Sequence, residues 1–158
     1  MSTPPIQEPG PLDHIPMPTF AAAPARVFGF NLRAGPLAAS EARHAFSAAE
    51  ESLSEDERHP VLLMLTELVT NAVRHGAGAE RPRGVAVKVV QSELAVGAAV
   101  TNPGTGFEWS GRDSDDPLEP GGYGLVLVDS MSSRWGIDRA SGSTTVWFEL
   151  DRRSRLAA

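Results

Sequence analysis

The feature that most constrains the fold is a long apolar segment in the middle of the chain. Positions 61–73 read VLLMLTELVTNAV and are mostly apolar. A segment that is apolar around most of a helical circumference is typical of a helix buried against other elements. We therefore expect a central helix from about Pro60 to His75, with Gly76 supplying a left-handed cap.

The residues before this helix give two conflicting signals. Ser54 and Glu57 have the spacing of a capping box, in which each residue satisfies a free backbone N–H of the other. Pro60 follows soon after, and a proline inside a helix costs about 3 kcal/mol. We therefore predict a short turn over 54–58 and a helix that starts at Pro60.

Two polar residues interrupt the apolar face of the expected helix. Glu67 and Asn71 are four residues apart and lie on the same side of a helix, and Arg74 and His75 continue that stripe. One interpretation is a narrow seam that faces solvent. The other is a lined site, because a carboxylate and an amide oxygen in register suit a hard cation such as Mg²⁺. A partly shielded carboxylate is also a plausible general base.

The remaining segments predict an α/β (α+β) two-layer sandwich: a mostly antiparallel sheet with helices on one face. Three units are expected: a disordered proline- and alanine-rich tail over 1–25, a folded domain over 26–151 and a short basic tail over 152–158. Within the domain we expect strands at 26–34, 84–91, 94–101, 134–140 and 143–150, and further helices at 36–53 and 121–133.

Composition removes several functional classes. The chain has no cysteine, which excludes disulfides and thiolate chemistry. Its net charge of -6 argues against general nucleic-acid binding, which needs a basic face. No apolar run approaches the roughly 18 residues of a membrane helix and no signal peptide is visible, so we expect no membrane contact and a cytoplasmic location.

Two glycine clusters flank an irregular acidic stretch. The first, NPGTGF at 102–107, follows an expected strand, and the second, GGYGL at 121–125, opens an apolar helix. Each is by itself consistent with a tight turn. Glycines also let a ligand approach the main chain, and a helix N-terminus offers free N–H groups to an anion.

The ordered set ELVTNAVRHG, NPGTGF, GGYGLVLV and STTVWFEL resembles the histidine kinase-like ATP-binding domain, with its Bergerat-type fold, that sensor histidine kinases share with gyrase-type ATPases. Within that superfamily the chain is most similar to the small anti-sigma-factor serine/threonine kinases of Gram-positive bacteria. The resemblance covers roughly residues 26–151. It implies that ATP and Mg²⁺ are bound.

The resemblance also implies roles for individual residues at the phosphate end of a nucleotide site. Asn71 would be the magnesium ligand. Glu67 would orient or deprotonate the attacking group, a substrate hydroxyl in the kinases. Gly122 and Gly124, with the N–H groups of the helix that continues through Leu125, would hold the phosphates.

At the adenine end, the resemblance assigns the loop to Gly104 and Gly106, the lid to 108–120, and a water-mediated contact with adenine to Thr144. Asn102 departs from the family pattern, which has aspartate there. Asparagine keeps one acceptor oxygen but loses the charge, and charge-assisted hydrogen bonds are roughly twice as strong as neutral ones. We predict retained ATP binding that is weaker by about 1–2 kcal/mol.

Two hypotheses on function follow. By resemblance, the chain would be an ATP-dependent serine/threonine protein kinase that binds a sigma factor, phosphorylates a small anti-anti-sigma protein and regulates transcription by partner switching. The alternative is a non-catalytic or weakly ATP-binding regulatory module that acts by protein contact, which Asn102 and the acidic lid favour. Relatives are commonly dimers through the sheet, so a homodimer is also expected.

Overall fold

The computed structural model describes residues 25–76, 84–103, 122–140 and 143–152. These residues form a five-stranded sheet in the order β1-β2-β3-β5-β4, in which every neighbouring pair is antiparallel. The strands are β1 (Arg26–Leu32), β2 (Val85–Gln91), β3 (Ala95–Pro103), β4 (Arg134–Ala140) and β5 (Ser143–Asp151). The helices of the described part are α2 (Ala38–Glu50), α3 (Glu55–Gly76) and α4 (Gly122–Met131).

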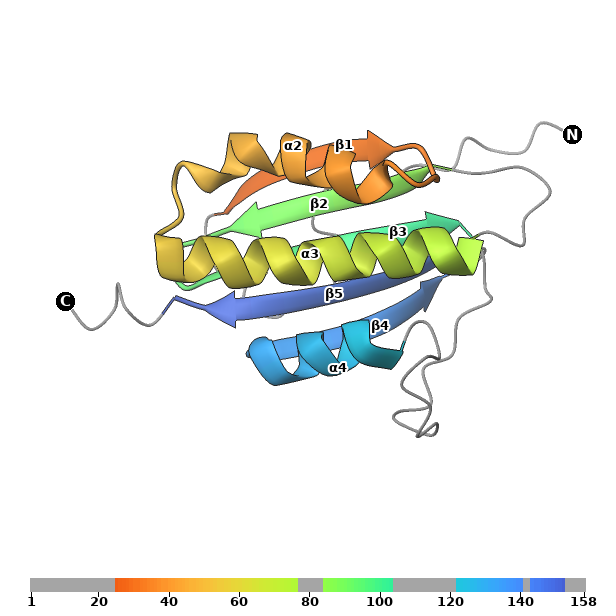
Figure 1. The fold of residues 1–158 in the computed structure, drawn as a ribbon. Coiled ribbons are helices and arrows are strands. Elements are labelled where there is room, and N and C mark those ends of the chain that lie inside the picture. Colours follow the sequence, from red (N-terminus) through yellow and green to blue (C-terminus); the bar gives the residue numbers. More distant parts are fainter. Residues whose placement is uncertain (1–24, 77–83, 104–121, 141–142, 153–158) are drawn as a thin grey trace, which may run out of the picture.

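The three helices lie on the same face of the sheet, with α3 in the middle (Figure 1). The core fills the space between the two layers. Phe46 of α2, Met64 and Leu65 of α3, Leu125 of α4 and Phe148 of β5 are all fully buried there. The predicted two-layer sandwich with helices on one face is therefore confirmed, as is the predicted order of its strands and helices.

The prediction that the central helix starts at Pro60 is wrong. α3 begins at Glu55 and contains Pro60 within its second turn. The capping box forms: the N–H of Ser54 donates to Glu57 Oε2 at 3.1 Å, and the N–H of Glu57 donates to Ser54 Oγ at 3.3 Å. Because Pro60 lies close to the start of the helix, only the bond to the carbonyl of Asp56 is forgone, and the cap offsets part of that loss.

The sequence predicts that Arg152 lies in the basic tail, but its side chain is buried and belongs to the fold. The guanidinium pairs with Glu57, with Nε 3.1 Å from Oε1 and Nη2 3.2 Å from Oε2. It also donates to the backbone carbonyls of Ser92 at 2.8 Å and Ser52 at 3.1 Å. Arg152 thus joins the start of α3, the β2–β3 turn and the end of β5, and the pairing offsets the cost of burying its charge.

Candidate functional site

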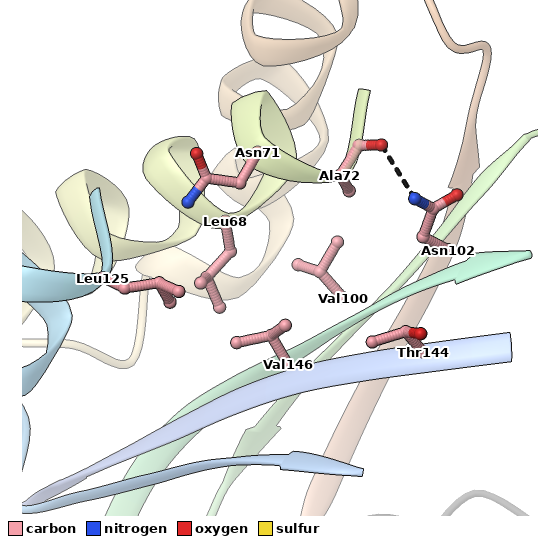
Figure 2. Close-up of a pocket in the computed structure, with 8 residues that line it drawn as sticks. All are labelled: Leu68, Asn71, Ala72, Val100, Asn102, Leu125, Thr144 and Val146. Carbon is pink, nitrogen blue, oxygen red and sulfur yellow. Dashed lines mark hydrogen bonds between the residues drawn. The ribbon is translucent and has the colours of Figure 1, made fainter. Parts of the chain in front are cut away.

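A pocket opens between α3, the ends of β3 and β5, and the first turn of α4 (Figure 2). Its volume is about 340 Å³, including its open mouth. Its walls are mainly apolar with a few polar groups, and the lining residues are Leu68, Asn71, Ala72, Val100, Asn102, Leu125, Thr144 and Val146.

The floor of the pocket consists of two cross-strand pairs. Asn102 of β3 is in register with Thr144 of β5, and Val100 is in register with Val146. Side chains of paired residues stand together on one face of a sheet, and alternate residues along each strand repeat that face. The antiparallel register therefore brings a polar pair and an apolar pair to the same end of the sheet, beneath α3.

Helices α3 and α4 meet closely beside this floor. A methyl group built on Gly124 would lie 2.9 Å from Asn71 Nδ2 and 3.0 Å from Glu67 Oε2. Both separations are shorter than carbon normally tolerates, so a side chain at position 124 would displace these two polar groups. Glycine at this position lets the N-terminal turn of α4 approach the carboxylate and the amide of α3.

Asn71 is buried, with 6% of its surface exposed. Within the described residues, its Nδ2 atom has no hydrogen-bond partner. A buried amide without a partner costs about 1–3 kcal/mol, so such a group marks a position where a ligand or water completes the site. The unpaired Nδ2 can donate to a phosphate oxygen, whereas a cation such as Mg²⁺ could be held only through the amide oxygen of Asn71 or the carboxylate of Glu67.

The side-chain amide of Asn102 donates a hydrogen bond to the backbone carbonyl of Ala72, with an N–O distance of 2.9 Å. Figure 2 shows the amide nitrogen directed at that carbonyl and the oxygen directed away from it. This contact fixes the orientation of the amide. Aspartate, the residue expected here from the resemblance described above, could not make this bond, because an ionised carboxylate has no proton to donate.

The structure gathers six of the predicted site residues in one region. Asn71, Asn102, Leu125 and Thr144 line the pocket, and Glu67 lies beside Asn71 against Gly124. Gly122 begins α4. Arg74 of the same helical stripe is exposed. The predictions for Gly104, Gly106 and the lid over 108–120 lie outside the described residues.

Sequence reasoning missed the apolar part of the lining: Leu68, Ala72, Val100 and Val146. Helical spacing could have predicted Leu68 and Ala72, since they are one turn apart and lie on the same side of the helix as Asn71. Strand alternation could have predicted Val100 and Val146, because each is two positions from a predicted site residue, Asn102 or Thr144, and so lies on the same face.

Among the described residues, no group of three or more His, Asp or Glu side chains is placed to hold a metal ion. None of the described helices is long and apolar enough to cross a membrane.

The chain belongs to the histidine kinase-like ATPase domain family, whose model matches residues 32–150. The match includes β2, β3, α3, α4 and all the described residues of the pocket. No curated protein matches the chain significantly.

Among solved structures, the chain is similar to the crystal structure of the RsbU and RsbW domains of Rv1364c from Mycobacterium tuberculosis. The two share 21% sequence identity with a TM-score of 0.59. The likeness covers 79% of this chain and 31% of the other, so the chain spans about a third of that protein. At this level of identity the comparison establishes the common fold.

Proposed function

We propose that the protein is an ATP-binding serine/threonine protein kinase of the anti-sigma-factor type, which regulates transcription through partner switching. The observation that carries the proposal is the meeting of Glu67 and Asn71 with Gly124 at the edge of the pocket. A carboxylate and an amide there lie beside the N-terminal turn of a helix, which attracts phosphate groups. Membership of the histidine kinase-like ATPase domain family and the RsbW domain in the similar structure support the same function.

We assign the phosphate end of the site to α3 and α4. Asn71 would contribute its amide oxygen to Mg²⁺, and the N–H groups around Gly122 and Gly124 would bind phosphate oxygens. Bound Mg²⁺ would neutralise charge on the phosphates, which is the main requirement of phosphoryl transfer. One or two protein ligands are enough for this ion, because Mg²⁺ usually retains several waters and takes further ligands from the substrate.

We assign the proton transfer to Glu67. Its carboxylate would accept the proton of a serine or threonine hydroxyl as the hydroxyl oxygen bonds to the γ-phosphorus. The bond from that phosphorus to the bridging oxygen breaks, and ADP leaves with the electron pair. General-base assistance of this kind contributes about 10²–10⁴-fold to a rate.

We assign the adenine end to Asn102, Gly104, Gly106 and Thr144. With its amide nitrogen bonded to Ala72, Asn102 offers its oxygen as an acceptor for the adenine amino group. This acceptor is neutral, so we propose that ATP binds more weakly than it does to an aspartate site.

The proposed protein partners are a sigma factor and a small anti-anti-sigma protein, with a homodimer as the possible assembly. A regulator of a sigma factor would act in the cytoplasm, where transcription takes place. The unit that performs these functions would be the domain over 26–151, which we extend to Arg152 because that side chain is buried in the fold.

The test is transfer of labelled phosphate from ATP to a purified anti-anti-sigma protein. The proposal expects label on serine or threonine with the natural chain and loss of transfer with Glu67→Ala, while nucleotide binding is kept. Transfer that is unchanged in Glu67→Ala would refute the role of Glu67. Nucleotide binding without transfer to any such substrate would favour the alternative, a regulatory module that acts by protein contact.

A further inference from the structure

The middle of α3 carries little charge on the side that faces away from the sheet. From Leu62 to Arg74 the only charged residues are Glu67 and Arg74. A helix in the outer layer of a sandwich usually has a charged face opposite its buried face. Figure 1 shows α3 between α2 and α4, and no described helix or strand lies over its outer side. Depletion of charged residues on such a side is typical of a surface that contacts another protein.

Leucine and threonine take the place of charged residues on this side. Leu63, Thr66 and Thr70 are half-buried. The hydroxyl of Thr66 donates to the carbonyl of Leu62 at 2.7 Å, and the hydroxyl of Thr70 donates to the carbonyl of Thr66 at 2.8 Å. Both hydroxyl protons are therefore used within α3. The surface that these three residues offer a partner is chiefly apolar.

The proposed base lies in the middle of this surface. Glu67 is half-buried, lies one turn after Leu63 and one turn before Thr70, and so shares their side of α3. In the proposed transfer, the hydroxyl of the protein substrate must reach this carboxylate. The side chains around it are therefore the part of α3 that the substrate would contact. We call Leu63, Glu67, Thr70 and Arg74 the acceptor stripe.

The acceptor stripe ends in an exposed cation. Arg74 follows Glu67 by seven residues, or two turns, so both side chains are on the same side of the helix. At 1.5 Å per residue, the two positions are about 10 Å apart along the helix axis. Within the part of the chain that the structure describes, no carboxylate forms an ion pair with Arg74. Its guanidinium can therefore bind a carboxylate of a docked protein.

We propose that the acceptor stripe docks the phosphate-accepting protein, and that Arg74 selects an acidic residue three positions from the serine or threonine that receives the phosphate. This inference rests on the proposed kinase function. An extended segment rises about 3.3 Å per residue, so about three residues cover the distance from Glu67 to Arg74. Leu63 is one turn away in the other direction, about 6 Å, and would contact an apolar side chain about two residues beyond the acceptor.

Arg74 acts on the choice of substrate and not on the chemistry. A guanidinium attracts a carboxylate in the docked segment and repels a lysine or arginine at the same position. Because Arg74 is exposed and two turns from Glu67, its replacement leaves the proposed base and the pocket in place. The expected signature is a change in KM for the acceptor protein, with little change in kcat or in the affinity for Mg-ATP.

The experiment measures transfer of labelled phosphate to a purified anti-anti-sigma protein over a range of acceptor concentrations. Arg74→Gln should raise KM for the acceptor by about fivefold, the upper range for an exposed ion pair. Arg74→Glu should raise it by about tenfold or more, because a like-charge contact replaces the pair. Arg43→Glu on the exposed side of α2 is the matched control and should leave KM unchanged. An unchanged KM with Arg74→Glu overturns the proposal.

A charge exchange identifies the residue that pairs with Arg74. Each acidic residue within three positions of the phosphorylated serine or threonine is replaced in turn by lysine. One of these acceptor variants should be a poor substrate for the natural chain and should regain a low KM with the Arg74→Glu chain. An acceptor with no acidic residue in that range, or with no exchange that restores KM, contradicts the role of Arg74.

The apolar part of the stripe has its own matched pair of variants. Leu63→Asn should raise KM for the acceptor, whereas Leu37→Asn, at a leucine that is 66% exposed at the start of α2, should not. Circular dichroism checks that both variants are folded. Equal values of KM for the two folded variants would show that the acceptor docks elsewhere.

Binding is measured separately from transfer, so that this inference and the proposed kinase activity can fail independently. Calorimetric titration of the acceptor protein, with a non-hydrolysable ATP analogue present, gives its affinity without transfer. Binding that is weakened by Arg74→Glu, with no transfer by the natural chain, would support the docking surface and reject the kinase. Weaker binding of Mg-ATP to Arg74→Gln, with an unchanged KM for the acceptor, would overturn the inference and place Arg74 at the phosphates.

Discussion

Asn102 and Ala72 are joined across the mouth of the pocket by a hydrogen bond of 2.9 Å from the side-chain amide to the backbone carbonyl. The bond ties the end of β3 to the last turns of α3, so the residue that would face the adenine also holds two layers together. An aspartate at position 102 could not make this bond, because an ionised carboxylate has no proton to donate and would face the carbonyl oxygen of Ala72.

Replacing Asn102 by Asp should therefore destabilise the fold even though it restores the residue typical of the family. We expect a loss of about 1–3 kcal/mol in the free energy of unfolding at neutral pH, measured by urea denaturation. Acidification should reduce this loss, because the protonated carboxyl can donate to Ala72, and the folded state then has the higher pKa for that group. Asn31→Asp on the exposed part of β1 is the control, and a Asn102→Asp chain as stable as the natural one at neutral pH would contradict this account of the bond.

Gly124→Ala tests the close approach of α3 and α4. The added methyl group would lie about 3 Å from Glu67 and Asn71 and displace both, so nucleotide affinity should fall by tenfold or more, about 1.4 kcal/mol. The stability should change little, because alanine also raises helix propensity by about 1 kcal/mol. Gly35→Ala, where no atom is within 4 Å of the added methyl, is the matched control. Equal affinities for the two variants would show that the contact at Gly124 is not part of the site.

Asn71→Ala tests the proposed metal contact. For the natural chain, removal of Mg²⁺ with a chelator should weaken ATP binding, since magnesium bridges the phosphates to Asn71. The variant should bind ATP about tenfold more weakly and respond less to the chelator, because about 1.4 kcal/mol of contact is already lost. Fluorescence titration with an ATP analogue, with and without Mg²⁺, measures both effects. An unchanged response to the chelator would exclude Asn71 as a ligand.

Arg152→Met tests the buried pair with Glu57. The substitution leaves the carboxylate of Glu57 buried without its partner, and breaking such a pair usually costs about 3–5 kcal/mol. The midpoint of urea unfolding should fall accordingly. Arg43→Met on the exposed side of α2 should change stability by less than about 0.5 kcal/mol. The double variant Glu57→Gln and Arg152→Met should recover part of the loss; a loss equal to the sum of the two single substitutions would rule out direct coupling.

Local patterns in the sequence were sufficient for the order of the strands and helices. Alternation defined β2 and β3, and the apolar run from Val61 to Val73 required a buried helix. The cost of Pro60 alone predicts a late start for α3, whereas contacts of Ser54 and Arg152 with Glu57 stabilise a start at Glu55. The capping box is local and visible in the sequence, but Glu57 is also held by Arg152, which is 95 residues away. No local pattern indicates that pairing.

At the site, too, local spacing was predictable and contacts between distant segments were not. The four-residue spacing of Glu67 and Asn71 placed both on one side of α3, and the structure brings Gly124 against them. The bond from Asn102 to Ala72 depends on the distance between a strand end and a helix end, which only the packed layers determine. For that reason the sequence alone does not predict that the amide nitrogen of Asn102 is bonded within the fold.

The central claim is that this pocket binds ATP, and calorimetric titration with Mg-ATP tests it most directly. The account predicts a saturable heat at or below millimolar ATP, about −4 kcal/mol or more favourable. Mg-GTP should bind more weakly, because the acceptor oxygen of Asn102 would face a carbonyl instead of an amino group. Gly35→Ala should titrate like the natural chain and Gly124→Ala should not. The absence of any heat at millimolar Mg-ATP, with a folded natural chain, would contradict the account.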